Sequence, residues 1–218
     1  MDESIVRLAV IVLPIVLAIT LHEAAHGYVA LLKGDPTAQR AGRITLNPLR
    51  HIDPIGTILV PIVLYVGAVM INQPPILFGW AKPVPVDFSR LRRPKRDMLW
   101  VAAAGPAANL AMALGWGLLL RVAVGQTDTS WAGALALMAE AGIGINLLLM
   151  VLNLLPMPPL DGGRIMISIL PDRLSMMFAQ LERYGLPILI VLLATRTLEA
   201  ILLPMLALAK AALLSLFF

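Results

Sequence analysis

Long apolar runs alternate with short polar stretches along the chain, and this pattern predicts membrane-spanning helices. A run of about 20 apolar residues is long enough to cross the hydrocarbon core of a bilayer as a helix. The pattern predicts a long first helix at 5–32, a shorter apolar segment at 55–71 that is interrupted by Pro61, and two clear spans at 98–124 and 131–155. The last region, 184–218, is expected to hold either two short helices or a half-helix and one span. Residues 172–183 have the pattern of an amphipathic surface helix.

Two polar stretches are expected to be extended rather than helical. Polar and apolar residues alternate at 43–46, which is the pattern of a short strand. Residues 79–86 include Pro83 and Pro85, whose rings favour extended backbone. We therefore expect short β-strands beside the helices.

The composition settles the class of protein. Apolar residues make up 59% of the 218, charged residues 14%, and the mean hydropathy is +0.86, whereas soluble domains average about a quarter charged residues. A chain this apolar cannot cover its own surface in water, so a soluble domain, a disordered chain and a coiled coil are excluded. The prediction is an all-α polytopic membrane protein of about five to six transmembrane helices, with residues 1–218 forming a single domain. The absence of cysteine excludes disulfides and thiolate metal sites.

The positive charges indicate how the chain lies in the membrane. Four lysines and arginines fall in 33–54 and six in 80–97, which is ten of the 17 in the chain. Basic stretches stay on the cytoplasmic side, and both can do so only if 55–71 enters the membrane and returns as a re-entrant hairpin. We expect a multi-pass protein of the cell membrane. The net charge of +4 then reflects this bias and lipid headgroups, not nucleic acid.

The sequence His22-Glu23-Ala24-Ala25-His26 lies inside the first apolar run. A spacing of four residues puts both imidazoles on one face of a helix, where they can bind one Zn²⁺, and Glu23 lies beside them to take a proton from water. Ionisable side chains are costly inside a membrane and point to function. The alternative is a buried His–Glu pair that only packs helices.

A zinc site that hydrolyses peptides needs a third protein ligand. The candidates are His51, Glu140 and Asp161. Glu140 and Asp161 lie at opposite ends of one predicted span, so only one of them can reach the depth of the histidines. The topology with a re-entrant hairpin brings Asp161 to the same side as His22 and His26, and we expect Asp161 to be the third ligand. His51, in a polar loop, is interpreted as a solvated or capping residue.

These residues together resemble the site-2 protease family of intramembrane zinc metalloproteases. The resemblance rests on His22-Glu23-x-x-His26 in one membrane helix and on Asn153-x-x-Pro156 followed by Asp161-Gly162. It covers most of the chain, in the short form without an inserted PDZ module or a nucleotide-sensing domain.

The resemblance implies a role for each matching residue. His22, His26 and Asp161 match the zinc ligands and Glu23 the general base. Asn153 matches an asparagine that contacts substrate or polarises its carbonyl. Gly105-Pro106-Ala107-Ala108-Asn109 resembles the motif on the intervening helix, where Asn109 is either a second polar contact to substrate or a helix-packing amide. The implied partner is a transmembrane protein or peptide, cut within or next to its membrane segment.

Two other classes of function share the same residues. A catalytically inactive zinc-binding scaffold would keep the ligands without activity. A metal transporter would repeat acidic or histidine ligands through several spans, whereas here they gather at one depth. Natural substrate, gating partner and oligomeric state leave no mark in the sequence.

Overall fold

The computed structural model describes residues 3–70, 79–126, 129 and 131–218, and all regular structure within them is helical. The elements before the central pair of helices are α1 (Glu3–Leu32), α2 (Thr37–Arg40), η1 (Pro48–Arg50), η2 (Pro54–Leu59), α3 (Val60–Met70) and η3 (Phe88–Arg90). They are followed by α4 (Pro94–Val124), α5 (Ala132–Leu154), α6 (Asp161–Ile169), α7 (Asp172–Ala179), α8 (Glu182–Ala194) and α9 (Thr197–Leu214).

Four described helices are long and apolar enough to cross a membrane: α1 from Val10, α4, α5 and α9. The number rises to five if α7 and α8, which meet at a 58° bend, count as one span. The prediction of a polytopic α-helical membrane protein is confirmed, with a number of spans at or below the lower end of the expected range.

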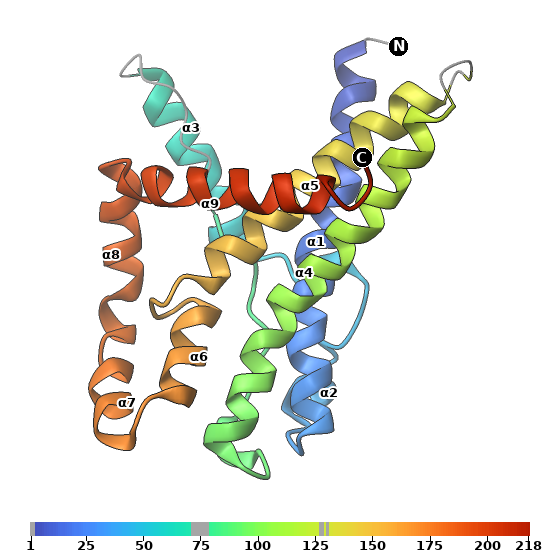
Figure 1. The fold of residues 1–218 in the computed structure, drawn as a ribbon. Coiled ribbons are helices and arrows are strands. Elements are labelled where there is room, and N and C mark those ends of the chain that lie inside the picture. Colours follow the sequence, from blue (N-terminus) through green and yellow to red (C-terminus); the bar gives the residue numbers. More distant parts are fainter. Residues whose placement is uncertain (1–2, 71–78, 127–128, 130) are drawn as a thin grey trace.

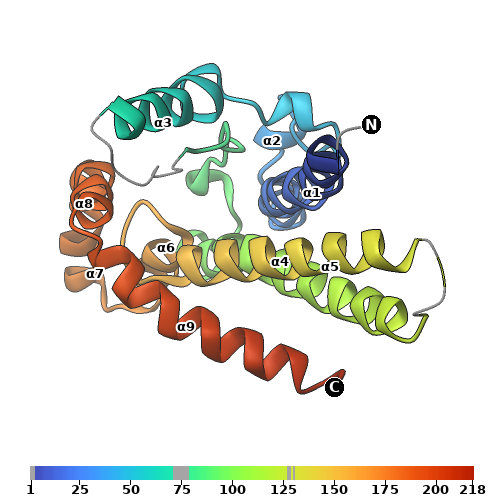
Figure 2. The ribbon, with the colours of Figure 1, turned by 90° about the horizontal axis from the view of Figure 1, so that it is seen from above.

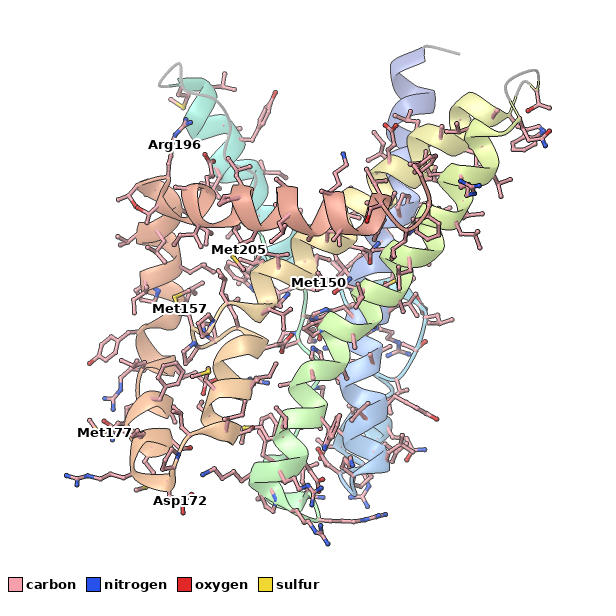
Figure 3. All side chains as sticks on the ribbon, viewed as in Figure 1. Met150, Met157, Asp172, Met177, Arg196 and Met205 are labelled. Atoms are coloured by element: carbon pink, nitrogen blue, oxygen red, sulfur yellow. The ribbon has the colours of Figure 1, made fainter. Side chains whose placement is uncertain are left out.

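The centre of the molecule is a three-helix unit of α1, α4 and α5 (Figures 1 and 2). Small residues permit the close approach, as is usual where no water drives membrane helices together. Ala113 and Ala139 are fully buried, and the ring of Trp116 packs where Gly142 has no side chain. Figure 1 also shows α9 running crosswise to α8 over this unit. Arg196, in a left-handed conformation with φ 57°, makes the corner between them (Figure 3).

The expected short strands are not formed by the described residues 43–46 and 79–86. Side-chain bonds to the backbone close the first segment into bends: the Arg43 guanidinium donates to the Arg50 carbonyl, and the Thr45 carbonyl lies 3.1 Å from Nε2 of His51. Alternation of polar and apolar residues therefore does not reflect pairing in a sheet here, and burial does not alternate either, since Arg43 is buried and Leu46 is exposed.

Residues 79–87, which we call the strap, are extended but pair with no strand among the described residues. Alternate residues of the strap donate their N–H groups to other parts of the chain. Trp80 donates to the Gly56 carbonyl (3.1 Å) and Lys82 to the His51 carbonyl (2.9 Å). The chain thus returns beside η2 after α3, although the return of the expected hairpin, at 71–78, lies outside the described residues. The backbone N–H of Asp87 anchors the end of the strap on buried Asp35 (2.7 Å).

Candidate metal and proteolytic site

Two elements distant in sequence place three metal-binding side chains together. His22 and His26 lie one turn apart on α1, and Asp161 is the first residue of α6. Nε2 of His22 lies 3.1 Å from Nε2 of His26, and Oδ2 of Asp161 lies 3.3 Å from each of them. Among the described residues this is the one group of three or more such side chains close enough to share a metal.

The break between α5 and α6 positions Asp161. Prolines stop α5 at Leu154 and turn the chain, and two glycines then allow α6 to lie tightly against the break. A side chain at Gly162 would overlap the Leu154 and Leu155 carbonyls, and one at Gly163 would overlap Pro158. The sequence after α5 thus turns Asp161 toward α1 instead of continuing the helix.

The outer nitrogens of both imidazoles are held by oxygen acceptors. Nδ1 of His26 lies 2.7 Å from the Val101 carbonyl, and Nδ1 of His22 lies 2.5 Å from Oδ1 of Asn109. Both Nδ1 atoms therefore carry the hydrogen, and both Nε2 atoms present lone pairs to the common centre. Oδ2 of Asp161, which adds a third acceptor there, is buried and accepts no hydrogen bond.

This arrangement fits a Zn²⁺ ion. Three acceptor atoms facing one another without a hydrogen between them repel unless a cation lies among them. Tetrahedral zinc with Zn–N distances of 2.0–2.1 Å separates two nitrogen ligands by about 3.3 Å, close to the separation seen here. Two imidazoles and one carboxylate form a ligand set typical of catalytic zinc, with a fourth position left for water or substrate.

Gly105 keeps the space for the ion open. A methyl group added at this position of α4 would overlap Nε2 of His26 and lie 2.7 Å from Nε2 of His22. The small-residue motif on α4 therefore does more than permit close helix packing. At this residue it leaves the volume in which a metal would lie.

A buried chain of amides supports the metal-binding side. Asn109 and Asn146 are both 0% exposed. The Asn109 amide nitrogen donates to the Ala18 carbonyl (3.3 Å) and to Oδ1 of Asn146 (2.9 Å), and the Asn146 amide nitrogen donates to the Gly142 carbonyl (2.8 Å). Of the two roles open for Asn109, the geometry favours the structural one, because the side chain bonds to His22 and does not line the cavity described below. Asn146 escaped the sequence analysis, although an amide within an apolar span was a usable signal.

Glu23 and Asn153 lie beside the metal-binding group in one cavity of about 730 Å³. Oε2 of Glu23 accepts a hydrogen bond from the backbone N–H of Val84 in the strap (2.8 Å), and the Asn153 amide donates to the Leu149 carbonyl (3.0 Å). The other lining residues are mainly aliphatic, from α1, α5 and α8, and include Val16, Ile19, Leu149, Leu152, Leu186 and Leu189.

The interpretation of His51 is confirmed in part. His51 is the C-cap of η1, where its backbone N–H donates to the Pro48 carbonyl (2.9 Å). It is not solvated, because it is 3% exposed, and it lines this same cavity. The strap and the bends at 43–46 cover it, and a pattern of polar neighbours in a loop could not reveal that cover.

Glu140, the other alternative for a third ligand, is exposed on α5 and is absent from the metal-binding group.

Comparison with known proteins places this arrangement among metallopeptidases. Residues 121–195 match the family described as Peptidase family M50, a stretch that includes Asn153 and Asp161. The chain is 38% identical over 210 residues to the Bacillus subtilis protein named "Putative zinc metalloprotease YwhC", covering 95% of this chain and 90% of that one. It is 32% identical over 186 residues to "Putative zinc metalloprotease Rip2" of Mycolicibacterium smegmatis, covering 84% of this chain and 66% of that one. No solved structure matches the chain significantly.

Proposed function

The chain belongs to peptidase family M50, the site-2 protease family of zinc metalloproteases, and from this membership we propose that it hydrolyses peptide bonds within or next to transmembrane segments of other proteins. One observation carries the proposal: Glu23 lines a cavity between apolar helices together with His22, and His22 belongs to the metal-binding group with His26 and Asp161. This combination supplies metal ligands and a proton acceptor at one place in a bundle of membrane helices.

His22, His26 and Asp161 are the proposed zinc ligands. When bound, zinc supplies Lewis acidity, which lowers the pKa of water to about 7 and polarises a peptide carbonyl. The Nδ1 bonds from His22 to Asn109 and from His26 to Val101 fix both rings in the tautomer that zinc requires.

Glu23 is the proposed general base. Its carboxylate takes the proton of the attacking water and delivers it to the nitrogen of the leaving amine. The N–H of Val84 holds one carboxylate oxygen and so sets the direction of the other. Asn153, whose amide nitrogen is bonded to α5, is the proposed polar contact to the substrate carbonyl.

The proposed orientation puts the site toward the cytoplasmic face of the cell membrane. The basic stretches after α1 and before α4 lie at one end of the bundle (Figure 1), as the positive-inside rule requires if that end is cytoplasmic. The bond from Trp80 to Gly56 supports a re-entrant hairpin at 55–78, because the chain enters and leaves the segment at one point.

The proposed substrate is a membrane segment that is locally extended when it is cut. A helix hides its carbonyls in hydrogen bonds, so a stretch must be unwound before Glu23 and zinc can act on it. Addition of the peptide as a strand beside 80–86 is one possible means, but N–H groups at Trp80, Lys82 and Val84 are already used and Pro83 and Pro85 have none. The strap can therefore offer a bound peptide mainly carbonyl acceptors.

A cleavage experiment tests the proposal. Purified protein in liposomes is mixed with single-span model substrates, and zinc content is measured alongside. Glu23→Gln should abolish cleavage and retain zinc, because Gln keeps an acceptor for the Val84 N–H but takes no proton. Asp161→Ala should lose both zinc and cleavage. Glu140→Gln, which changes an exposed carboxylate on α5, is the matched control and should cut normally. Cleavage by Glu23→Gln at the wild-type rate would refute the proposal.

A further inference from the structure

His51 is a buried histidine in the cavity that the proposed chemistry does not use. It lies between η1 and η2, is 3% exposed, and lines the cavity together with Glu23 and Asn153. The proposed ligands and base account for the other ionisable groups of the described lining. The position of His51 in the same cavity therefore needs its own explanation.

The hydrogen bonds of His51 determine which nitrogen carries the hydrogen. Nε2 lies 3.1 Å from the Thr45 carbonyl. A carbonyl oxygen can only accept, so Nε2 donates and Nδ1 presents a lone pair. Nδ1 is buried and has no hydrogen-bond partner among the described residues. A buried acceptor without a donor is unfavourable, and such groups in native structures call for an explanation.

The backbone around His51 holds this acceptor in place. The His51 carbonyl accepts the Lys82 N–H of the strap, and the next carbonyl before it, that of Arg50, accepts the Arg43 guanidinium. These bonds hold the backbone at His51, and the contact of Nε2 with Thr45 together with the burial of the side chain holds the ring.

We propose that His51 is a substrate-binding residue whose Nδ1 accepts a hydrogen bond from a backbone N–H of the peptide to be cut. This inference rests on the proposed function, because it concerns the same cavity. A peptide stretch drawn out of a helix exposes N–H groups, and in a place with little water they need acceptors. His51 and the strap form a wall that is rich in acceptors and poor in free donors, which complements such a stretch.

Two substitutions at His51 separate its two nitrogens. Gln places its amide nitrogen near the position of Nε2 and can keep the bond to Thr45, but it has no acceptor at the position of Nδ1. Asn places an acceptor near Nδ1. In the Glu23→Gln background, which binds without cutting, His51→Gln should weaken binding of a fluorescent single-span substrate about 3- to 10-fold, the range of one neutral hydrogen bond. His51→Asn should recover part of that loss, and zinc content should stay at one per chain in both.

Changing the substrate tests the same bond from its other side. In a series of model substrates, one peptide bond at a time near the cleavage site is replaced by an ester, which has no N–H. One position should lose affinity about 3- to 10-fold with His51 present, and the same ester should cost nothing further with His51→Gln. This coupling is a result that a merely structural His51 would not give.

The outcomes distinguish this inference from the proposed function. Equal affinities with and without His51, or no coupling to any ester, would overturn the role of His51. Normal cleavage by the wild type in the same experiments would still support the proposed protease function. Loss of zinc together with a lower melting temperature in both variants would assign His51 to the structure and overturn the inference. Absence of wild-type cleavage for every substrate would count against the proposed function itself.

Discussion

The two sides of the cavity are built in different ways. The metal-binding side consists of the long helices α1, α4 and α5 and the start of α6, and side-chain bonds inside the bundle join its polar groups from His22 through Asn109 to Asn146. The side formed by η1, η2 and the strap consists of short helices and extended chain. Bonds that involve the backbone hold it together, and the Val84 N–H joins it to Glu23. In the proposed function, the helices would fix the position of the metal, whereas the loop side would present groups to the peptide. Changes on the first side should therefore affect zinc, and changes on the second should affect catalysis or binding with zinc retained.

Gly105→Ala should have the largest effect on the metal-binding side. The added methyl group overlaps His26 and fills the space for the ion, so zinc content should fall close to zero and cleavage with it. Gly115→Ala on the same helix is the matched control, because a side chain there meets nothing within 4 Å. Metal analysis of the two purified variants checks this. Full zinc in Gly105→Ala would show that the ion lies elsewhere.

Asn109→Ala should have the next largest effect. It removes the acceptor that orients His22, and loss of such outer partners commonly costs about 10- to 100-fold in metal affinity. Competition with a zinc chelator measures the affinity. Asn146→Ala, one step further from the metal, should have a smaller effect. An equal loss in the two variants would mean that the amides act through general packing.

Val84→Pro tests the loop side. It removes the N–H that holds Glu23, so kcat should fall about 3- to 10-fold, the range of one hydrogen bond, with zinc content unchanged. Val84→Ala keeps the N–H and trims the side chain, and it should retain the wild-type kcat. Steady-state cleavage of a model substrate gives the values. Zinc loss in Val84→Pro would contradict the proposed division of roles between the two sides of the cavity.

The smallest effect is expected away from both sides, at the foot of the bundle. The Lys95 ammonium, 2.6 Å from Asp172, holds the pKa of that exposed carboxyl below its usual value of 3.8 (Figure 3). A carboxyl whose pKa is lower in the folded state stabilises the fold at pH values above its unfolded pKa. This stabilisation is lost as the pH falls through its folded pKa. Asp172→Asn should therefore lower the melting temperature slightly at pH 7 and not at all near pH 2. Solvent screens such pairs strongly, and zinc content at pH 7 should equal that of the wild type.

The sequence predicted the metal-binding side better than the loop side, for a physical reason. Helix period, membrane depth and the distribution of positive charge can be read from the sequence, and together they led to Asp161 as the partner of His22 and His26. Contacts such as Val84 with Glu23, or the strap over His51, join residues far apart and leave no periodic pattern. Alternation at 43–46 was misleading because the bonds of Arg43 to Arg50 and of Thr45 to His51 fold this stretch into bends. The crosswise course of α9 also depends on packing, here against α5, and hydropathy alone does not give it.

The volume of the cavity limits what the protein can act on. One turn of helix, about 10 Å wide and 5.4 Å long, fills about 420 Å³, so a cavity of about 730 Å³ holds less than two turns. Selection among membrane segments would then depend on how readily a few residues fray, and much less on the rest of the segment. Glycine or another weak helix former placed near the cut should count for more than an extended recognition sequence.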